Sequence, residues 1–145
     1  SVSERLLNML GLMRKAGAIE IGETNTGGIC RAGKAKLLLL AADASENAQS
    51  RASGFVRGRN VITVKLPFTK SEVSAHVGLN GCAMAAVTDI GFANAFIKAL
   101  SQEYPGVYDE CASEVEQRFS KAERRKKEAA THERNKRNGK RRTNV

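Results

Sequence analysis

A short apolar run, Leu37 to Ala42, is the feature that most constrains how this chain can fold. It lies between Lys36 and Asp43 and contains no polar side chain. A run this short cannot cross a bilayer, and it is typical of a strand that is buried on both faces. Because such a strand needs helices above and below it, the run predicts an α/β fold.

The rest of residues 1–106 alternates between helical and strand patterns. Helices are expected from about residue 3 (capped by Ser3) to 17, from 24 to 32, from 46 to 57, from 70 to 78 and from 90 to 104. Strands are expected at residues 18–22, 37–42, 61–64 and 83–87. Thr69 and Glu72 fit a capping box, and Asp43, Ser45 and Asp89 are expected to be caps or turn residues. This order predicts a three-layer α/β/α sandwich around a mixed four-stranded sheet.

Positive charge is concentrated near the C-terminus of the sequence. The net charge is +9, and residues 117–145 hold 12 basic side chains against three glutamates. A small protein this basic usually meets an anionic polymer or surface. The shift in composition divides the chain into a globular domain, residues 1–106, and a basic extension, residues 107–145.

The extension has a narrow apolar stripe formed by Cys111, Val115, Phe119 and Ala122 at helical spacing. We expect it to be helical to about residue 132 and disordered from Asn138 onward, with the stripe packed on the parent domain rather than on a partner. Contacts with phosphates are expected from Arg124, Arg125, Lys126, Lys127, Lys136, Arg137, Lys140, Arg141 and Arg142.

No constellation in the sequence indicates an enzyme, a metal site or a cofactor. The three cysteines are widely spaced without a CxxC pair, so we expect reduced and mostly buried thiols. Residues 28–35 nearly match a phosphate-binding P-loop, but Ala35 replaces the Ser or Thr and the segment leads into a strand. With no targeting segment recognisable, a cytoplasmic monomer is the expectation.

Several segments taken together resemble the ribosomal L-seven-Ae family of kink-turn RNA-binding proteins. Residues 31–36 are followed by the apolar strand and by Asp43-Ala44-Ser45, and the helix opened by Thr69, the loop at 78–81 and residues 83–89 come later in the same order. Residues 10–17 resemble the start of the bacterial YlxQ-like branch of this family. The resemblance covers residues 4–100 and leaves the basic extension outside.

In this family the RNA surface joins the start of the second helix and the loop before the last strand. The family pattern at the helix is Gly-x-Asn-Glu-x-x-Lys, and Gly22 matches its glycine. Thr24 stands at the Asn position, Asn25 at the Glu position and Gly28 at the Lys position, although a slip of one residue would align Asn25 with the Asn. The resemblance implies an RNA site formed by Gly22, Glu23, Thr24, Asn25, Thr26, Gly28, Arg31, Lys34, Lys36, Val77, Gly78, Leu79 and Asn80.

Elementary chemistry also favours this site. A helix start offers free backbone N–H groups and a partial positive charge, and glycines allow a phosphate backbone to approach closely. Simpler alternatives stay open: the glycines as turn residues, Arg31 and Lys34 as a solvated face, and the loop as a plain connector.

The leading hypothesis is therefore non-enzymatic binding of structured, kink-turn-like RNA by a ribosomal or ribosome-associated protein, with ribosomal or assembly proteins as further partners and no membrane partner. The alternative is a protein-interaction or assembly module on the same fold, with non-specific RNA affinity confined to the extension.

Overall fold

The computed structural model describes residues 2–78, 80 and 82–143, with side chains described for 4–78, 80 and 82–139. Four strands form one sheet in the order β1-β4-β2-β3: β1 (Ile19–Ile21), β2 (Leu37–Leu40), β3 (Ile62–Lys65) and β4 (Met84–Val87). β4 is antiparallel to both of its neighbours, whereas β2 and β3 are parallel, so the sheet is mixed as predicted. Every residue of the central strands β2 and β4 is buried, which explains why neither strand contains a polar side chain.

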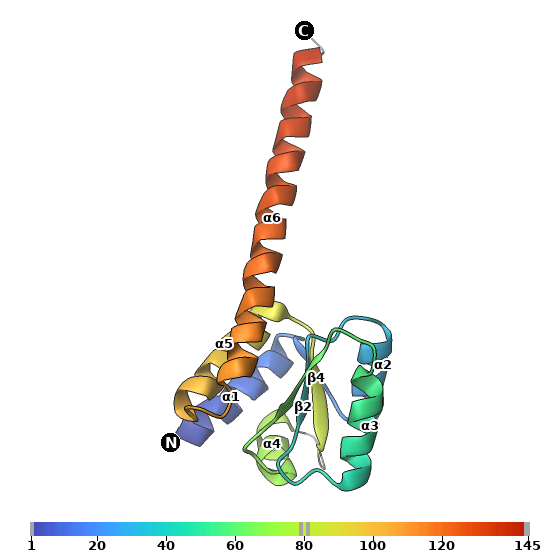
Figure 1. Ribbon diagram of the computed structural model, residues 1–145, viewed down its shortest axis with the longest axis vertical. Coiled ribbons are helices and arrows are strands. Elements are labelled where there is room, and N and C mark those ends of the chain that lie inside the picture. The colour runs from blue at the N-terminus through green and yellow to red at the C-terminus, as the bar shows by residue number, and fades with distance from the viewer. Residues whose placement is uncertain (1, 79, 81, 144–145) are drawn as a thin grey trace.

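Helices cover both faces of the sheet (Figure 1). They are α1 (Val2–Lys15), α2 (Glu23–Arg31), α3 (Glu46–Val56), α4 (Lys70–Val77), α5 (Ile90–Glu103) and α6 (Asp109–Thr143). Leu37 and Leu39 belong to a core shared with α1, α4, α5 and the beginning of α6. Leu38 and Leu40 point to the other face, where they pack with the alanines of α3 and with Cys30 of α2. The three-layer α/β/α sandwich is thus confirmed.

The predicted caps are largely confirmed. Thr69 and Glu72 form the capping box of α4, and the side chains of Ser45 and Asp89 accept hydrogen bonds at the starts of α3 and α5. Asp43 is also a cap, but of a distant helix: its carboxylate accepts a 2.7 Å hydrogen bond from the backbone N–H of Lys70 in α4. The expected cap Ser3 is wrong, because α1 already begins at Val2.

α6 is longer than the sequence predicts. The helix continues to Thr143, so the expected end near residue 132 and disorder from Asn138 are wrong for the described part. Its beginning packs on the domain as predicted, because Val115 is fully buried and the Phe119 ring lies near Gly91 of α5. Tyr108, just before α6, donates a 2.6 Å hydrogen bond to the carbonyl of Lys65 in β3.

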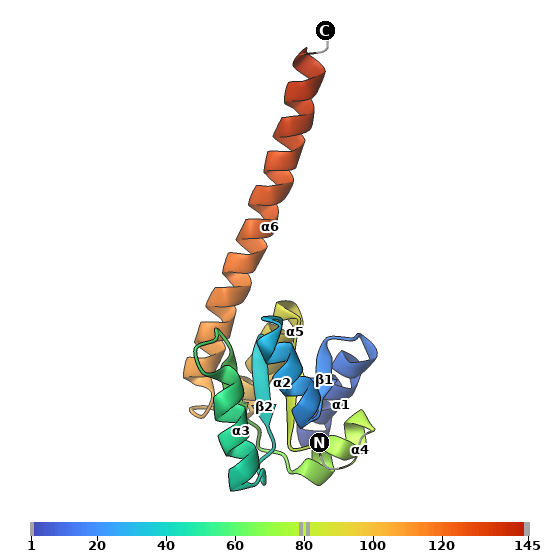
Figure 2. The ribbon, with the colours of Figure 1, turned by 90° about the vertical axis from the view of Figure 1, so that its right-hand side faces the viewer.

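Beyond Glu123 the described residues of the same helix are not buried against the domain. Every described side chain from Arg124 to Gly139 is exposed, and α6 projects away from the sandwich (Figure 1). Figure 2 shows that it extends past the end of the sheet opposite to α4. Within the described residues, no helix is both long and apolar enough to span a membrane.

Candidate nucleic-acid interface

The start of α2 presents backbone donors that no side chain caps. Gly22 is the N-cap, with φ 101° and ψ 159°, a conformation that is essentially restricted to glycine. Its N–H donates to the carbonyl of Met84 and its carbonyl accepts from Thr26. No described side chain accepts a hydrogen bond at this helix start, so the N–H groups of the first turn are left for solvent or an anion.

The loop that leads into β4 lies at the same edge of the sheet. Ile21 pairs with Ala85, and the hydrogen bond from Gly22 to Met84 places the start of α2 beside the start of β4. Cys82, just ahead of that strand, is buried; burial raises the pKa of its thiol, and hydrogen bonding to the backbone of Gly22 and Met84 partly offsets the rise. The structure therefore brings together the two regions that the family resemblance pairs.

The polar side chains of the first turn of α2 differ in how far they are available. Thr24 is exposed. Asn25 donates a 2.9 Å hydrogen bond to the carbonyl of Ile21, and Glu23 is held by an ion pair of 2.9 Å with Arg51 of α3. Thr26 is fully buried, and its hydroxyl has no hydrogen-bond partner among the described residues, so the expected contact of Thr26 with RNA is wrong.

The loop residues also separate into surface and core. Val77 is buried against the sheet, so its assignment to the RNA surface is not supported. Gly78 ends α4 in the left-handed conformation, close to the guanidinium of Arg14. Asn80 is exposed and lines a shallow hollow with Asp43 and Lys70, while Leu79 lies outside the described residues.

Two adjacent glycines in α2 have different surroundings. A Cβ atom on Gly27 would lie 2.8 Å from the ring of Phe55, so this glycine allows α2 and α3 to pack closely. A Cβ atom on Gly28 would meet no heavy atom within 4 Å. The position where the family pattern has lysine is therefore open and could accommodate one.

The predicted basic residues lie elsewhere. The guanidinium of Arg31 folds back toward Gly27, but Lys34 follows the end of α2. The backbone N–H of Lys36 donates to the carbonyl of Val87 at the end of β4, whereas Gly22 contacts the beginning of that strand. The structure thus separates Lys34 and Lys36 from the start of α2 by the length of a strand.

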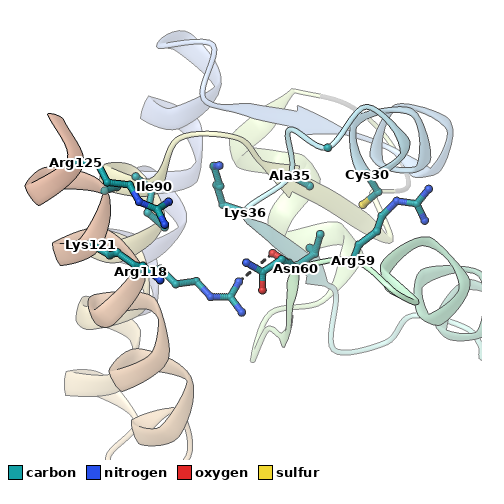
Figure 3. A pocket seen from close by; sticks show the side chains of 12 residues that line it. Cys30, Ala35, Lys36, Arg59, Asn60, Ile90, Arg118, Lys121 and Arg125 are labelled. Atoms are coloured by element: carbon teal, nitrogen blue, oxygen red, sulfur yellow. Dashed lines mark hydrogen bonds between the residues drawn. The ribbon is translucent and has the colours of Figure 1, made fainter. Parts of the chain in front are cut away.

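Lys36 instead lines a cleft between the domain and α6. The cleft has a volume of about 570 Å³ and also contains Arg59, Arg118, Lys121 and Arg125 (Figure 3). Of these five cations, sequence reasoning named only Lys36 and Arg125 as candidates. The helical spacing of Arg118, Lys121 and Arg125 was a visible signal, but nothing local indicated that Arg59 would line the same cleft.

All three cysteines are free, with Cys30 and Cys82 buried and Cys111 half-buried, as expected for reduced thiols. Burial raises the pKa of each thiol above its ordinary value. No group of three or more His, Cys, Asp or Glu among the described side chains is placed to hold a metal ion.

These features define an α/β/α sandwich in which one helix start, at Gly22, has no side-chain cap among the described residues and lies beside the loop into a central strand. Neither a protein-family model nor a curated protein matches the chain. Among solved structures, a protein of unknown function from Bacillus halodurans is similar with a TM-score of 0.60 and 18% identity, covering 66% of this chain and 96% of that one. The Giardia lamblia 15.5kD RNA binding protein is similar with a TM-score of 0.54 and 18% identity, covering 70% of this chain and 86% of that one. This likeness shows that the domain shares its α/β fold with these two proteins.

Proposed function

We propose that the chain binds structured RNA, without catalysing a reaction, through the edge that joins the start of α2 to the loop into β4. The observation that carries the proposal is the helix start capped only by Gly22, placed beside the residues that enter β4. Its exposed N–H groups suit a phosphate, and the exposed Thr24 and Asn25 suit a 2′-hydroxyl or a base edge. The similar fold of an RNA-binding protein and the net charge of +9 support the same function.

We further infer that the target is a kink-turn-like element in ribosomal or ribosome-associated RNA. This inference rests on the resemblance of residues 31–45 to the L-seven-Ae family and of residues 10–17 to the start of its YlxQ-like branch. A cytoplasmic location is consistent with three free thiols, because reducing compartments keep cysteines unpaired.

The test is a titration of the full chain against a kink-turn RNA and against the same RNA without its G·A pairs, at about 150 mM salt, where non-specific contacts are weakened. We expect a preference of tenfold or more for the intact kink, which corresponds to about 1.4 kcal/mol. Equal binding of the two RNAs would contradict kink-turn recognition.

A matched pair of variants locates the site. Thr24→Glu adds one negative charge at the proposed edge, whereas Gln102→Glu adds one to the exposed surface of α5 in the opposite helical layer. Thr24→Glu should weaken binding to the kink-turn RNA much more than Gln102→Glu does. Equal effects of the two variants would exclude the start of α2 as the site.

The alternative function, a protein-interaction or assembly module, is favoured by one observation. The open position at Gly28 lacks the cation of the family pattern, which removes a phosphate contact from the edge. In that case RNA binding would depend on the basic extension alone, and Thr24→Glu would leave it unchanged.

A further inference from the structure

The cleft between α6 and the domain gathers cations from distant parts of the chain. Lys36 lies just before β2 and Arg59 just before β3, while Arg118, Lys121 and Arg125 belong to α6. Figure 3 shows the α6 residues along one wall, with Lys36 and Arg59 on the side of the domain. No Asp or Glu is among the lining residues that the structure describes.

The wall formed by α6 is held in place by the polar contacts of Arg118 and by an apolar contact with the core. Arg118 donates a 2.9 Å hydrogen bond to the carbonyl of Asn60 and forms a 2.7 Å ion pair with Glu114. Val115, three residues before Arg118, is fully buried in the core. Because these contacts fix the beginning of α6, Lys121 and Arg125 face the cleft without a ligand to position them.

The remaining cations are not neutralised by the protein. Within the described residues, no carboxylate forms an ion pair with Lys36, Lys121 or Arg125, and all three side chains are exposed. Among the described residues, Arg59 makes a 3.4 Å hydrogen bond to the carbonyl of Phe55 and no ion pair with a carboxylate. Like charges that converge on a concave surface produce a local positive potential, which concentrates anions there.

The other lining residues indicate what kind of anion fits. Apart from Asn60 and Cys30, the described lining residues without charge are small or aliphatic, such as Ala35, Val61 and Ile90, and none is aromatic. The cleft therefore offers no surface for stacking a base and no carboxylate for a ribose hydroxyl. Cations on two walls, with no aromatic or carboxylate side chain among the described lining residues, match a series of phosphates along a nucleic-acid backbone rather than a single nucleotide.

We propose that this cleft is a second RNA-binding site, which holds the phosphodiester backbone of RNA independently of sequence. It lies where β4 ends, whereas the start of α2 lies where β4 begins, so the two sites are separate surfaces of the domain. A single RNA occupies both sites only by passing along the domain; otherwise the protein holds two RNA segments. The proposal goes beyond the edge at α2 and does not depend on it.

The test compares two double variants of the full chain that remove the same charge. Lys36→Gln with Lys121→Gln removes two exposed cations of the cleft, and Lys65→Gln with Lys98→Gln removes two exposed cations of the domain outside it. The probe is a 16-base-pair RNA duplex without a kink, and its affinity is measured between 50 and 300 mM KCl. Each lost phosphate contact lowers the salt slope by about 0.9, so the salt slope of the cleft variant should fall by close to two. Its affinity for the duplex at 150 mM KCl should fall by about tenfold or more. The affinity of the control variant for the duplex should fall threefold or less.

Three outcomes would overturn the proposal. Equal weakening by both variants would show a general charge effect, and unchanged binding by the cleft variant would show no contact there. Displacement of the duplex by millimolar ATP would identify a nucleotide site instead. Unfolding midpoints in urea confirm that both variants fold.

Failure of this proposal is distinguishable from failure of the proposed function. The cleft variant should keep the preference of the chain for the intact kink-turn RNA, whereas Thr24→Glu should reduce that preference and keep duplex binding. A crosslinking experiment with a 4-thiouridine duplex adds a direct readout, because crosslinks should fall on residues 33–36, 59–61 and 118–125. Crosslinks confined to residues 126–145 would contradict the cleft.

Discussion

Gly28 offers the most direct test of how the edge at α2 recognises RNA. The position is helical and half-buried, and a Cβ atom there meets nothing within 4 Å. A glycine inside a helix costs about 0.5 to 1 kcal/mol relative to alanine. Gly28→Ala should therefore raise the free energy of unfolding by about that amount. Gly27→Ala is the matched contrast: its Cβ would lie 2.8 Å from the Phe55 ring, and overpacking of this kind costs about 1 to 3 kcal/mol.

Gly28→Lys adds a cation at the position where the family pattern has one. One additional phosphate contact steepens the salt dependence of binding by about 0.9, which at 150 mM salt corresponds to roughly fivefold higher affinity, or about 1 kcal/mol. The assay is a titration with the kink-turn RNA at several KCl concentrations, with urea unfolding of the same variants. Gly28→Ala is the control, because it stiffens the helix without adding charge.

The comparison can refute the reasoning in two ways. If Gly28→Ala and Gly28→Lys raise the affinity equally, the gain comes from a stiffer helix and not from a phosphate contact. If neither variant nor Gly28→Glu changes binding, RNA does not reach this face of α2. A gain for lysine together with a loss for glutamate is the expected result.

Three further predictions concern stability in urea. Thr26→Val removes a fully buried hydroxyl without a partner and should raise the free energy of unfolding by about 1 kcal/mol; a decrease would show that the hydroxyl is satisfied in solution. Burial raises the pKa of the Cys30 and Cys82 thiols, so the protonated thiols favour the folded state. Their contribution to the free energy of unfolding is fully present below the ordinary thiol pKa of about 8.5 and is lost as the pH rises through the raised pKa values. The urea midpoint should therefore fall at alkaline pH, and less steeply in Cys82→Ala. Tyr108→Phe removes the 2.6 Å hydrogen bond to Lys65 and should cost about 0.5 to 1.5 kcal/mol, whereas an unchanged midpoint would show that this bond contributes nothing.

Local signals in the sequence predicted most of the fold. The apolar run 37–42 identified the central strand, and the capping residues Thr69, Glu72 and Asp89 identified two helix starts. These features depend on side chains within a few residues of one another, which is why a single sequence reveals them. The cap formed by Asp43 on α4 was not predictable in this way, since 27 residues separate it from Lys70.

The candidate site was less predictable because nearness in sequence is not nearness in space. Lys36 was grouped with Gly22, yet α2 carries the chain from one end of the sheet to the other between them. Thr26 was expected at the surface for its polarity, but it is on the inner face of α2 together with Cys30. The end of α6 could not be predicted because an exposed helix without an apolar stripe leaves no pattern of burial in the sequence.

The directions in which the exposed cations of α6 point depend on the rotation of the helix about its axis. A continuous helix advances about 1.5 Å and turns about 100° with each residue, so the direction in which every distal cation points is set by the number of residues that precede it. Deleting one alanine at position 129 or 130 would turn Lys136 and Arg137 to another side of the helix axis while hardly shortening α6. The charged residues and the net charge would be unchanged by that deletion, and only the directions in which the distal charges point would differ.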